Sequence, residues 1–245
     1  MGERAVGERT RGWWAATADL LLGAGCPGCG TPWWGACPVC REHLQAQPTR
    51  LTAPDPSPAG FPLTATAGPY DDIHRGLLTA HKEDQALMLT ALLGDRLAAS
   101  LGELLRVRRV PTEEPVLVVP VPSAAAAVRE RGFDATGALA KRAVRRLSVD
   151  RPVRAAGLLA QHRGLADQSG LDASQRAANL RGGLRLRQGW AAGRRRPDGP
   201  ALVIVDDLVT TGASLAEAAR CLSQGGFEVL GAATVSATVR RLSSY

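Results

Sequence analysis

The chain has 245 residues, of which 45% are hydrophobic, and it carries a net charge of +7. This length accommodates one sizeable core and a small extra module, and the apolar content excludes a disordered chain. The charge is uneven: residues 121–200 hold sixteen basic and six acidic side chains, whereas residues 51–120 hold six basic and nine acidic. The basic segment favours an anionic ligand, although a solvated arginine surface without a partner would have the same composition.

The most apolar N-terminal run covers residues 13–24 and is too short for a membrane span, which needs about 20 residues. Asp19 interrupts this run, and no convincing cleavage site of a signal peptide follows it. We therefore expect a short amphipathic helix over Trp13 to Leu22, no membrane span and a cytoplasmic location.

Four of the five cysteines form two CxxC pairs that are separated by seven residues: Cys26, Cys29, Cys37 and Cys40. Paired CxxC motifs present four thiolates to zinc, and four protein ligands leave no open position, so we predict a structural zinc site. A disulfide framework or a redox pair is the alternative, but disulfides are rare in chains that are not exported. His43 could compete as a ligand. Residues 1–46 are thus predicted to be a helix and a zinc knuckle.

Residues 47–69 are rich in proline and read as a linker that ends in a strand at 63–67. Residues 70–245 then form the main predicted domain. Its leucine spacing predicts helices over 72–80 and 84–106. His74 and His81 in this region are expected to be surface or capping residues rather than ligands.

The next apolar run, 115–122, has no polar alternation, which indicates a strand buried on both faces of a parallel sheet. A turn leads from this strand into a helix near residue 124, and a second helix is expected over 135–147. The polar stretch 161–179 is the candidate functional loop, because loops of this length in compact domains are usually functional. A strand is expected at 184–187.

The most informative stretch is 201–214. Its apolar start predicts a buried strand, which the acidic pair Asp206 and Asp207 follows, and then a turn with three hydroxyl side chains and one glycine. A helix is expected from Leu215 to Leu222, so backbone N–H groups at its start would point into the turn and favour a phosphate there. An ordinary capped helix is the alternative, but capping needs one hydroxyl and no acidic pair. A final strand is expected over 227–239.

The stretch 203–214 resembles the phosphoribosyl pyrophosphate (PRPP) motif of type I phosphoribosyltransferases at every constrained position. The chain as a whole resembles the ComF family, whose members include ComFC-like and GntX-like proteins. The features that carry this resemblance, in order, are the four-cysteine knuckle, Tyr70 with Arg75 and Lys82, the Val-Pro-Val-Pro strand end 119–122, the segment 129–133, the segments 168–171 and 176–182, and the PRPP motif.

The resemblance implies an α/β fold with a doubly wound, mostly parallel sheet of the type I phosphoribosyltransferase kind. It also implies Mg²⁺-dependent binding of PRPP and transfer of its phosphoribosyl group to an acceptor that the sequence does not identify. It assigns the ribose hydroxyls and the catalytic role to Asp206 and Asp207. The 5′-phosphate falls to Thr210, Thr211, Gly212, Ala213 and Ser214, and the pyrophosphate side to Pro122, Ser123, Arg129, Arg131 and Lys82.

The competence association of the family supplies an alternative function. A chain that keeps the fold and lacks catalysis could serve DNA uptake, with single-stranded DNA and DNA-uptake proteins as partners.

The sequence also departs from the family pattern, because Ala124 to Ala127 stand where members often carry His and Arg. The resemblance therefore supports phosphoribosyl binding more strongly than turnover.

Overall fold

The computed structural model describes residues 25–162, 182–187 and 200–238. The helix expected over 13–22 lies outside these residues, as does most of the polar stretch 161–179. Among the described helices, none is long and apolar enough to cross a membrane.

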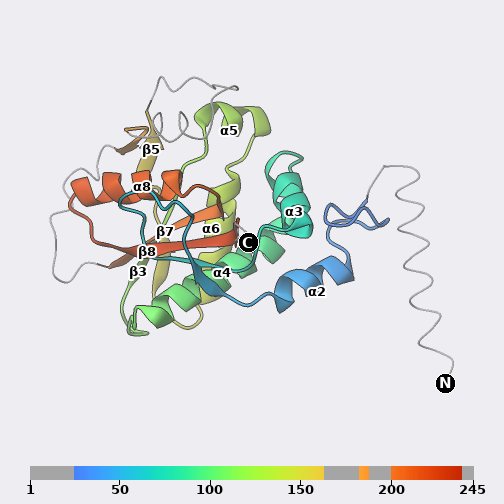
Figure 1. The fold of residues 1–245 in the computed structure, drawn as a ribbon, viewed down its shortest axis with the longest axis horizontal. Helices are drawn as coiled ribbons and strands as arrows, with labels where there is room; N and C mark the ends of the chain where they lie inside the picture. Colours follow the sequence, from blue (N-terminus) through green and yellow to red (C-terminus); the bar gives the residue numbers. More distant parts are fainter. Residues whose placement is uncertain (1–24, 163–181, 188–199, 239–245) are drawn as a thin grey trace, which may run out of the picture.

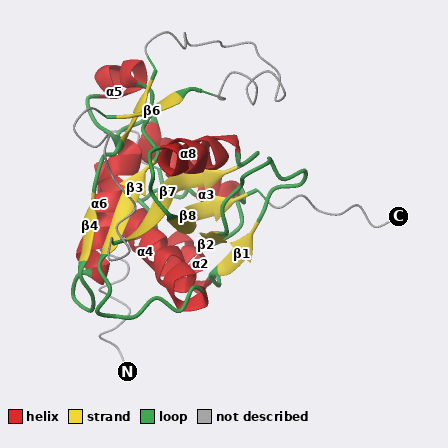
Figure 2. Cartoon of the chain, turned by 90° about the vertical axis from the view of Figure 1, so that its left-hand side faces the viewer, coloured by secondary structure: helices red, strands yellow, loops and turns green. Residues whose placement is uncertain are grey.

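A six-stranded sheet forms the centre of the fold (Figure 1), and its strands follow the order β1-β2-β8-β7-β3-β4 (Figure 2). All neighbouring strands are parallel except β1, which runs antiparallel to β2, and a second sheet consists of the antiparallel pair β5 and β6. The strands are β1 (Arg50–Thr52), β2 (Thr64–Thr66), β3 (Val116–Pro120), β4 (Val153–Ala155), β5 (Leu159–Gln161), β6 (Leu184–Leu186), β7 (Ala201–Val209) and β8 (Val229–Ala237). The helices are α2 (Pro38–Ala46), α3 (Asp72–Lys82), the short 3-10 helix η1 (Leu87–Leu89), α4 (Thr90–Val107), α5 (Ala125–Arg131), α6 (Ala135–Leu147) and α8 (Ala213–Gln224).

Helices cover both faces of the six-stranded sheet, so the predicted α/β fold with a mostly parallel sheet is confirmed (Figure 2). Side chains alternate along a strand, and β7 shows the result. Val203 and Val205 pack into one core with α4 and α6, whereas Leu202 and Ile204 pack into a second core with α8. A strand that is buried on both faces must be apolar throughout, which explains the runs without polar alternation.

The elements expected after residue 70 are present, with shifts at their ends. The helix over 135–147 has the predicted bounds. The helix expected from residue 84 begins instead at Thr90, after a turn in which Gln85 adopts a positive φ of 55°. The strand expected to end before the acidic pair is longer than predicted and continues to Val209. It continues because β8 still pairs with it at that point, so Asp206 and Asp207 lie within the strand.

The proline-rich stretch 47–69 contributes directly to the main body of the protein. It supplies β1 and β2 to the six-stranded sheet, and Phe61 packs against the core that lies under α8. The peptide between Asp55 and Pro56 is cis.

The four-cysteine knuckle packs on α3 by close contact of two backbones. A Cβ atom at Gly76, in the middle of α3, would lie 1.9 Å from the carbonyl oxygen of Pro27. Glycine is unfavourable inside a helix, and this contact explains its presence here. On the other side of the contact, a Cβ at Gly28 would meet Ile73 of α3 at 3.1 Å.

We expect Gly76→Ala to lower the free energy of unfolding by about 1–3 kcal/mol, because the added methyl group forces the knuckle away from α3. Gly102→Ala in α4 is the matched control: a Cβ there meets nothing within 4 Å. The control should raise stability by about 0.5–1 kcal/mol, since alanine favours a helix. Denaturant unfolding of both variants measures the difference. Equal effects of the two substitutions would contradict the described contact.

Candidate functional site

The two strands that carry the predicted site lie side by side, and the chain leaves them in opposite directions. From β3 the chain passes through α5 and α6 to β4, whereas from β7 it passes through α8 to β8. In an open α/β sheet, such a reversal of strand order leaves a crevice outside the carboxyl ends of the strands, and ligands commonly bind there.

A cleft of about 470 Å³ occupies this crevice. It brings together most of the residues predicted for the site, although they come from three separate parts of the chain. Four predicted residues do not line the cleft: Arg129, which is exposed, and the turn residues Thr211, Gly212 and Ala213. The lining residues are Lys82, Glu83, Val121, Pro122, Ser123, Ala124, Ala127, Arg131, Thr136, Gln161, Asp206, Asp207, Leu208, Thr210 and Ser214.

Asp206 and Asp207 are neighbours in β7, so their side chains leave the strand on opposite sides, but both line the cleft at the edge of the sheet. Asp207 shares the face of Val203 and Val205, where it meets the end of α3: the Lys82 Nζ lies 3.4 Å from Asp207 Oδ2. The Asp207 carboxylate raises the pKa of Lys82, so the ammonium group stays charged over the physiological range. Because the ion pair of Lys82 and Asp207 lies at the border of the cleft, it contributes little to the free energy of unfolding. Its main effect is on the distribution of charge along the cleft.

Asp206 lies in a less favourable environment. Burial, followed by the negative charge of Asp207, raises the pKa of Asp206 well above its usual range. Its Oδ1 accepts a hydrogen bond of 2.9 Å from the Asp207 backbone N–H. A carboxylate in this position gains stability when hydroxyl donors or a cation approach it. The pair therefore suits the vicinal hydroxyls of a sugar, and its hard oxygen atoms also fit a magnesium ion.

The turn between β7 and α8 presents the start of a helix to the cleft. Gly212 has a φ of +75°, and a Cβ atom there would lie 2.6 Å from the Phe61 ring and 2.9 Å from Pro54. Thr210 and Ser214 line the cleft on either side of this glycine. The first N–H groups of α8 lack partners within the helix, so the turn can bind an anion. The proximity of Phe61 to this turn was not predicted, because no local pattern connects the two segments.

On the β3 side, Arg131 is held by protein groups rather than extended into the cleft. It is 8% exposed, and its guanidinium donates to the Lys82 carbonyl oxygen at 2.9 Å and to Glu83 at 3.3 Å. Arg131 therefore ties α5 to the end of α3, beside the lysine that meets Asp207. Ser123 is 3.4 Å from Asp134, which caps α6.

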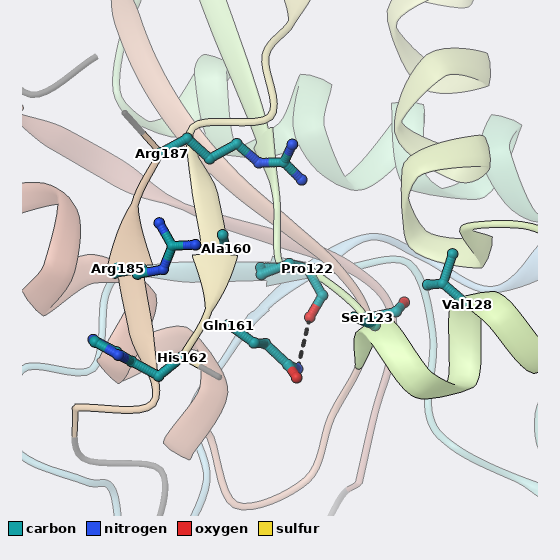
Figure 3. A pocket seen from close by; sticks show the side chains of 9 residues that line it. Pro122, Ser123, Val128, Ala160, Gln161, His162, Arg185 and Arg187 are labelled. Carbon is teal, nitrogen blue, oxygen red and sulfur yellow. Dashed lines mark hydrogen bonds between the residues drawn. The ribbon is translucent and has the colours of Figure 1, made fainter. Parts of the chain in front are cut away.

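A second cavity, of about 950 Å³, adjoins the cleft (Figure 3). The strands β5 and β6 form one wall, and α5 with the loop before it forms the other. The Gln161 side chain bridges the two walls, because its amide donates to the Pro122 carbonyl oxygen at 3.1 Å. The lining residues are Pro122, Ser123, Ala125, Val128, Ala160, Gln161, His162, Arg185 and Arg187.

The four cysteines of the knuckle form a compact cluster in which all Sγ atoms lie within 4.8 Å of one another. Sulfur atoms at tetrahedral corners around zinc, with bonds of about 2.3 Å, are roughly 3.8 Å apart. Cys29 Sγ and Cys37 Sγ are separated by 3.6 Å, and all four thiols are free rather than paired in disulfides. Hydrogen bonds with Thr31 lower the pKa of Cys29 to about 6, which favours the thiolate that zinc requires, whereas burial raises the pKa of Cys37 and Cys40. The cluster fits a structural zinc ion.

His43 lies apart from this cluster, in a network with Asp71 and His74. Its Nε2 is 2.6 Å from Asp71 Oδ2, while His74 Nδ1 is 2.8 Å from Asp71 Oδ1. Burial opposes the shift, but hydrogen bonds from the His74 backbone N–H and from the two imidazoles lower the pKa of Asp71 to about 2. The expectation that His74 and His81 are surface residues is wrong, since they are 0% and 1% exposed. Both lie on the face of α3 that packs into the protein, and burial lowers the pKa of each.

Several sequence predictions cannot be located in the structure. The segment 168–171 lies outside the described residues, as does the stretch 176–181. Cys221, the fifth cysteine, is buried in α8 and packs with the apolar core there. Comparison with protein families finds no match for the chain, and comparison with curated proteins finds none either.

We expect about one zinc ion per chain, measured by elemental analysis of the purified protein. Cys40→Ser should abolish zinc binding and destabilise the knuckle, because Cys40 is fully buried in the cluster. Cys221→Ser is the control, since this cysteine lies in α8 and belongs to no cluster of metal ligands among the described residues. Zinc retained by Cys40→Ser, or lost from Cys221→Ser, would contradict the assignment.

We expect Asp206→Asn to raise the free energy of unfolding at neutral pH. A carboxyl group whose folded pKa is raised contributes its stability below the unfolded value of 3.8 and loses it as the pH rises through the folded pKa. The gain from the substitution should therefore be small near pH 4 and larger near pH 7.5, as measured by denaturant unfolding. Asp150→Asn, at an exposed position after α6, should change stability by less than about 0.5 kcal/mol at either pH. A variant that is less stable than the wild type at both pH values would refute the prediction.

Proposed function

We propose that this protein binds a 5-phosphoribosyl group, with PRPP as the ligand, and transfers it to an acceptor. One observation carries the proposal. The acidic pair of β7 and the hydroxyl-bearing turn before α8 line the same cleft as the end of β3 and Lys82. The motif resemblance predicts these same groups, and the proposal is supported by the general preference of ligands for the crevice at the carboxyl ends of the strands in open α/β sheets.

Each part of the cleft has a role in this proposal. The turn at 210–214 holds the 5′-phosphate, because the N–H groups at the start of α8 and the nearby hydroxyls are hydrogen-bond donors. Asp206 and Asp207 accept hydrogen bonds from the ribose hydroxyls. Lys82 lies beside Asp207 and balances part of the ligand's negative charge.

The leaving pyrophosphate requires positive charge near the loop after β3, which includes Pro122 and Ser123. Lys82 supplies this charge directly. Arg131 acts indirectly, because it donates a hydrogen bond to the Lys82 carbonyl oxygen and so helps to hold Lys82 in position. Arg129 is exposed outside the cleft, so its predicted role there depends on a movement of α5. A magnesium ion held by the diphosphate and the acidic pair would supply further charge neutralisation.

The proposed transfer forms one bond at the ribose C1 and breaks another. The acceptor's lone pair bonds to C1 as the C1–O bond to pyrophosphate breaks, and that electron pair leaves with the pyrophosphate. The acceptor's proton passes to water. Transfer of this kind develops positive charge on the ribosyl centre, so the protein acts mainly by positioning the reactants and neutralising charge.

Membership of the ComF family, and with it the association with competence, is part of this proposal and rests on the sequence resemblance alone. The nucleic-acid alternative has weaker support. Several arginines of the basic segment bond to protein groups: Arg142 to Asp95, Arg151 to the Val110 carbonyl oxygen and Arg131 to the end of α3. The exposed cations of this segment that remain for such a partner, within the described residues, include Lys141, Arg145 and Arg146 on α6 and also Arg129, Arg154 and Arg187.

Calorimetry with PRPP and with ribose 5-phosphate, each in the presence of Mg²⁺, tests the proposal. The wild type should bind both ligands, and PRPP more tightly, because the pyrophosphate adds contacts. Thr210→Val/Ser214→Ala should weaken both ligands at least tenfold, since it removes two hydroxyl donors from the cleft, and each such bond to a charged group contributes about 1.5–3 kcal/mol. Asp206→Asn/Asp207→Asn should weaken both ligands as well.

Asp150→Asn is the control for these carboxylates, because it makes the same chemical change at one exposed aspartate after α6. It should leave both affinities unchanged. Absence of binding by the folded wild type, or equal affinities in all variants, would overturn the proposed function. Release of pyrophosphate with a panel of nucleophiles then separates turnover from binding alone.

A further inference from the structure

The second cavity has a chemical character that phosphoribosyl binding does not explain. Pro122, Ser123 and Gln161 line both this cavity and the cleft, so the two spaces adjoin. A molecule in the cavity therefore lies beside the cleft in which the ribose is proposed to bind. With a volume of about 950 Å³, the cavity is large enough for a small organic molecule.

The sequence Leu184-Arg185-Leu186-Arg187 explains how this cavity acquires its charge. Side chains alternate along a strand, so the two leucines share one face of β6 and the two arginines share the other. The leucines pack into the core beneath α8. Both arginines consequently line the cavity, where Ala160 of β5 lies directly opposite Arg185 in the strand register.

One of the arginines is fixed in position. The Arg187 Nε donates to the Leu159 carbonyl oxygen at 3.1 Å. The backbone N–H of Arg187 donates to the Leu158 carbonyl oxygen at 2.8 Å. This leaves the two terminal nitrogens of the guanidinium for other partners. Figure 3 shows Arg187 reaching inward from the end of β6 while Arg185 lies beside Ala160. An oriented guanidinium is suited to a planar carboxylate or to a phosphate.

Acidic side chains do not balance these charges within the described part of the chain. The described lining of the cavity includes no aspartate or glutamate, and the ion pairs found among described residues involve neither arginine. The remaining wall is largely apolar, with Pro122, Ala125 and Val128. Two cations beside an apolar wall match a ligand with an anionic group and an apolar body.

We propose that the acceptor of the phosphoribosyl group is an organic anion, whose carboxylate or phosphate binds Arg185 and Arg187. Its apolar body lies against the wall formed by α5 and the loop after β3. Its nucleophilic atom then faces the cleft across Ser123. This proposal rests on the proposed function for the reaction, but the anion-binding cavity can be tested separately. The competing description is a water-filled groove with two solvated arginines.

Ligand-observed NMR with the whole 245-residue chain tests this assignment with three probes of similar size: benzoate, phenyl phosphate and the uncharged benzamide. We expect benzoate or phenyl phosphate to bind at least tenfold more tightly than benzamide. The stronger of the two anions then identifies the anionic group that the cavity prefers. Arg185→Gln/Arg187→Gln should abolish the preference for the anion. The matched control is Arg145→Gln/Arg146→Gln, which removes the same charge from the exposed end of α6 and should leave the preference intact.

The same variants, titrated with PRPP and Mg²⁺, separate this inference from the proposed function. Arg185→Gln/Arg187→Gln should retain PRPP binding, because neither arginine lines the cleft. If the anions bind the cavity and PRPP does not bind the protein, the proposed function fails and the anion site remains. If PRPP binds and the three probes bind equally or not at all, the acceptor proposal is overturned. Anion preference that survives in Arg185→Gln/Arg187→Gln overturns it as well.

Discussion

The contact between Lys82 and Asp207 is the interaction through which the separate parts of this fold meet. Lys82 is the last residue of α3, and Asp207 lies in the central strand β7. The opposite end of α3 is capped by Asp71 and packed against the four-cysteine knuckle, while Arg131 of α5 holds the Lys82 carbonyl oxygen. The helix α3 thus contacts the knuckle at Ile73 and Gly76 and the cleft at Lys82.

Several groups in and around the cleft have environments that are energetically unfavourable when no ligand is bound. Burial and a neighbouring carboxylate disfavour ionised Asp206, and the turn beside it requires a glycine with positive φ under an aromatic ring. Two arginines face the adjoining cavity. Such groups lower the stability of a protein unless a ligand satisfies them, and their concentration at one edge of the sheet distinguishes a binding site from ordinary surface.

Much of the architecture was predictable because local rules agree with the tertiary structure. The helix over 135–147 has an aspartate cap and an amphipathic pattern, and it forms with the predicted bounds. The strand β7 was too short in the prediction, since carboxylates are unusual in a buried strand and only its pairing with β8 keeps it extended. His74 and His81 were misplaced for a related reason, because polarity alone does not reveal which face of α3 packs inward.

The amino-acid sequence by itself determined the α/β class, the four-cysteine cluster and the acidic pair followed by a hydroxyl-bearing turn. These features depend on residues that are near one another in the chain, so spacing and periodicity are sufficient to find them. Only the tertiary structure decided that Lys82 meets Asp207, that Phe61 covers Gly212 and that Arg185 and Arg187 face a cavity beside the cleft. Each depends on which strands are neighbours and which way their side chains point, and both are consequences of packing the whole chain.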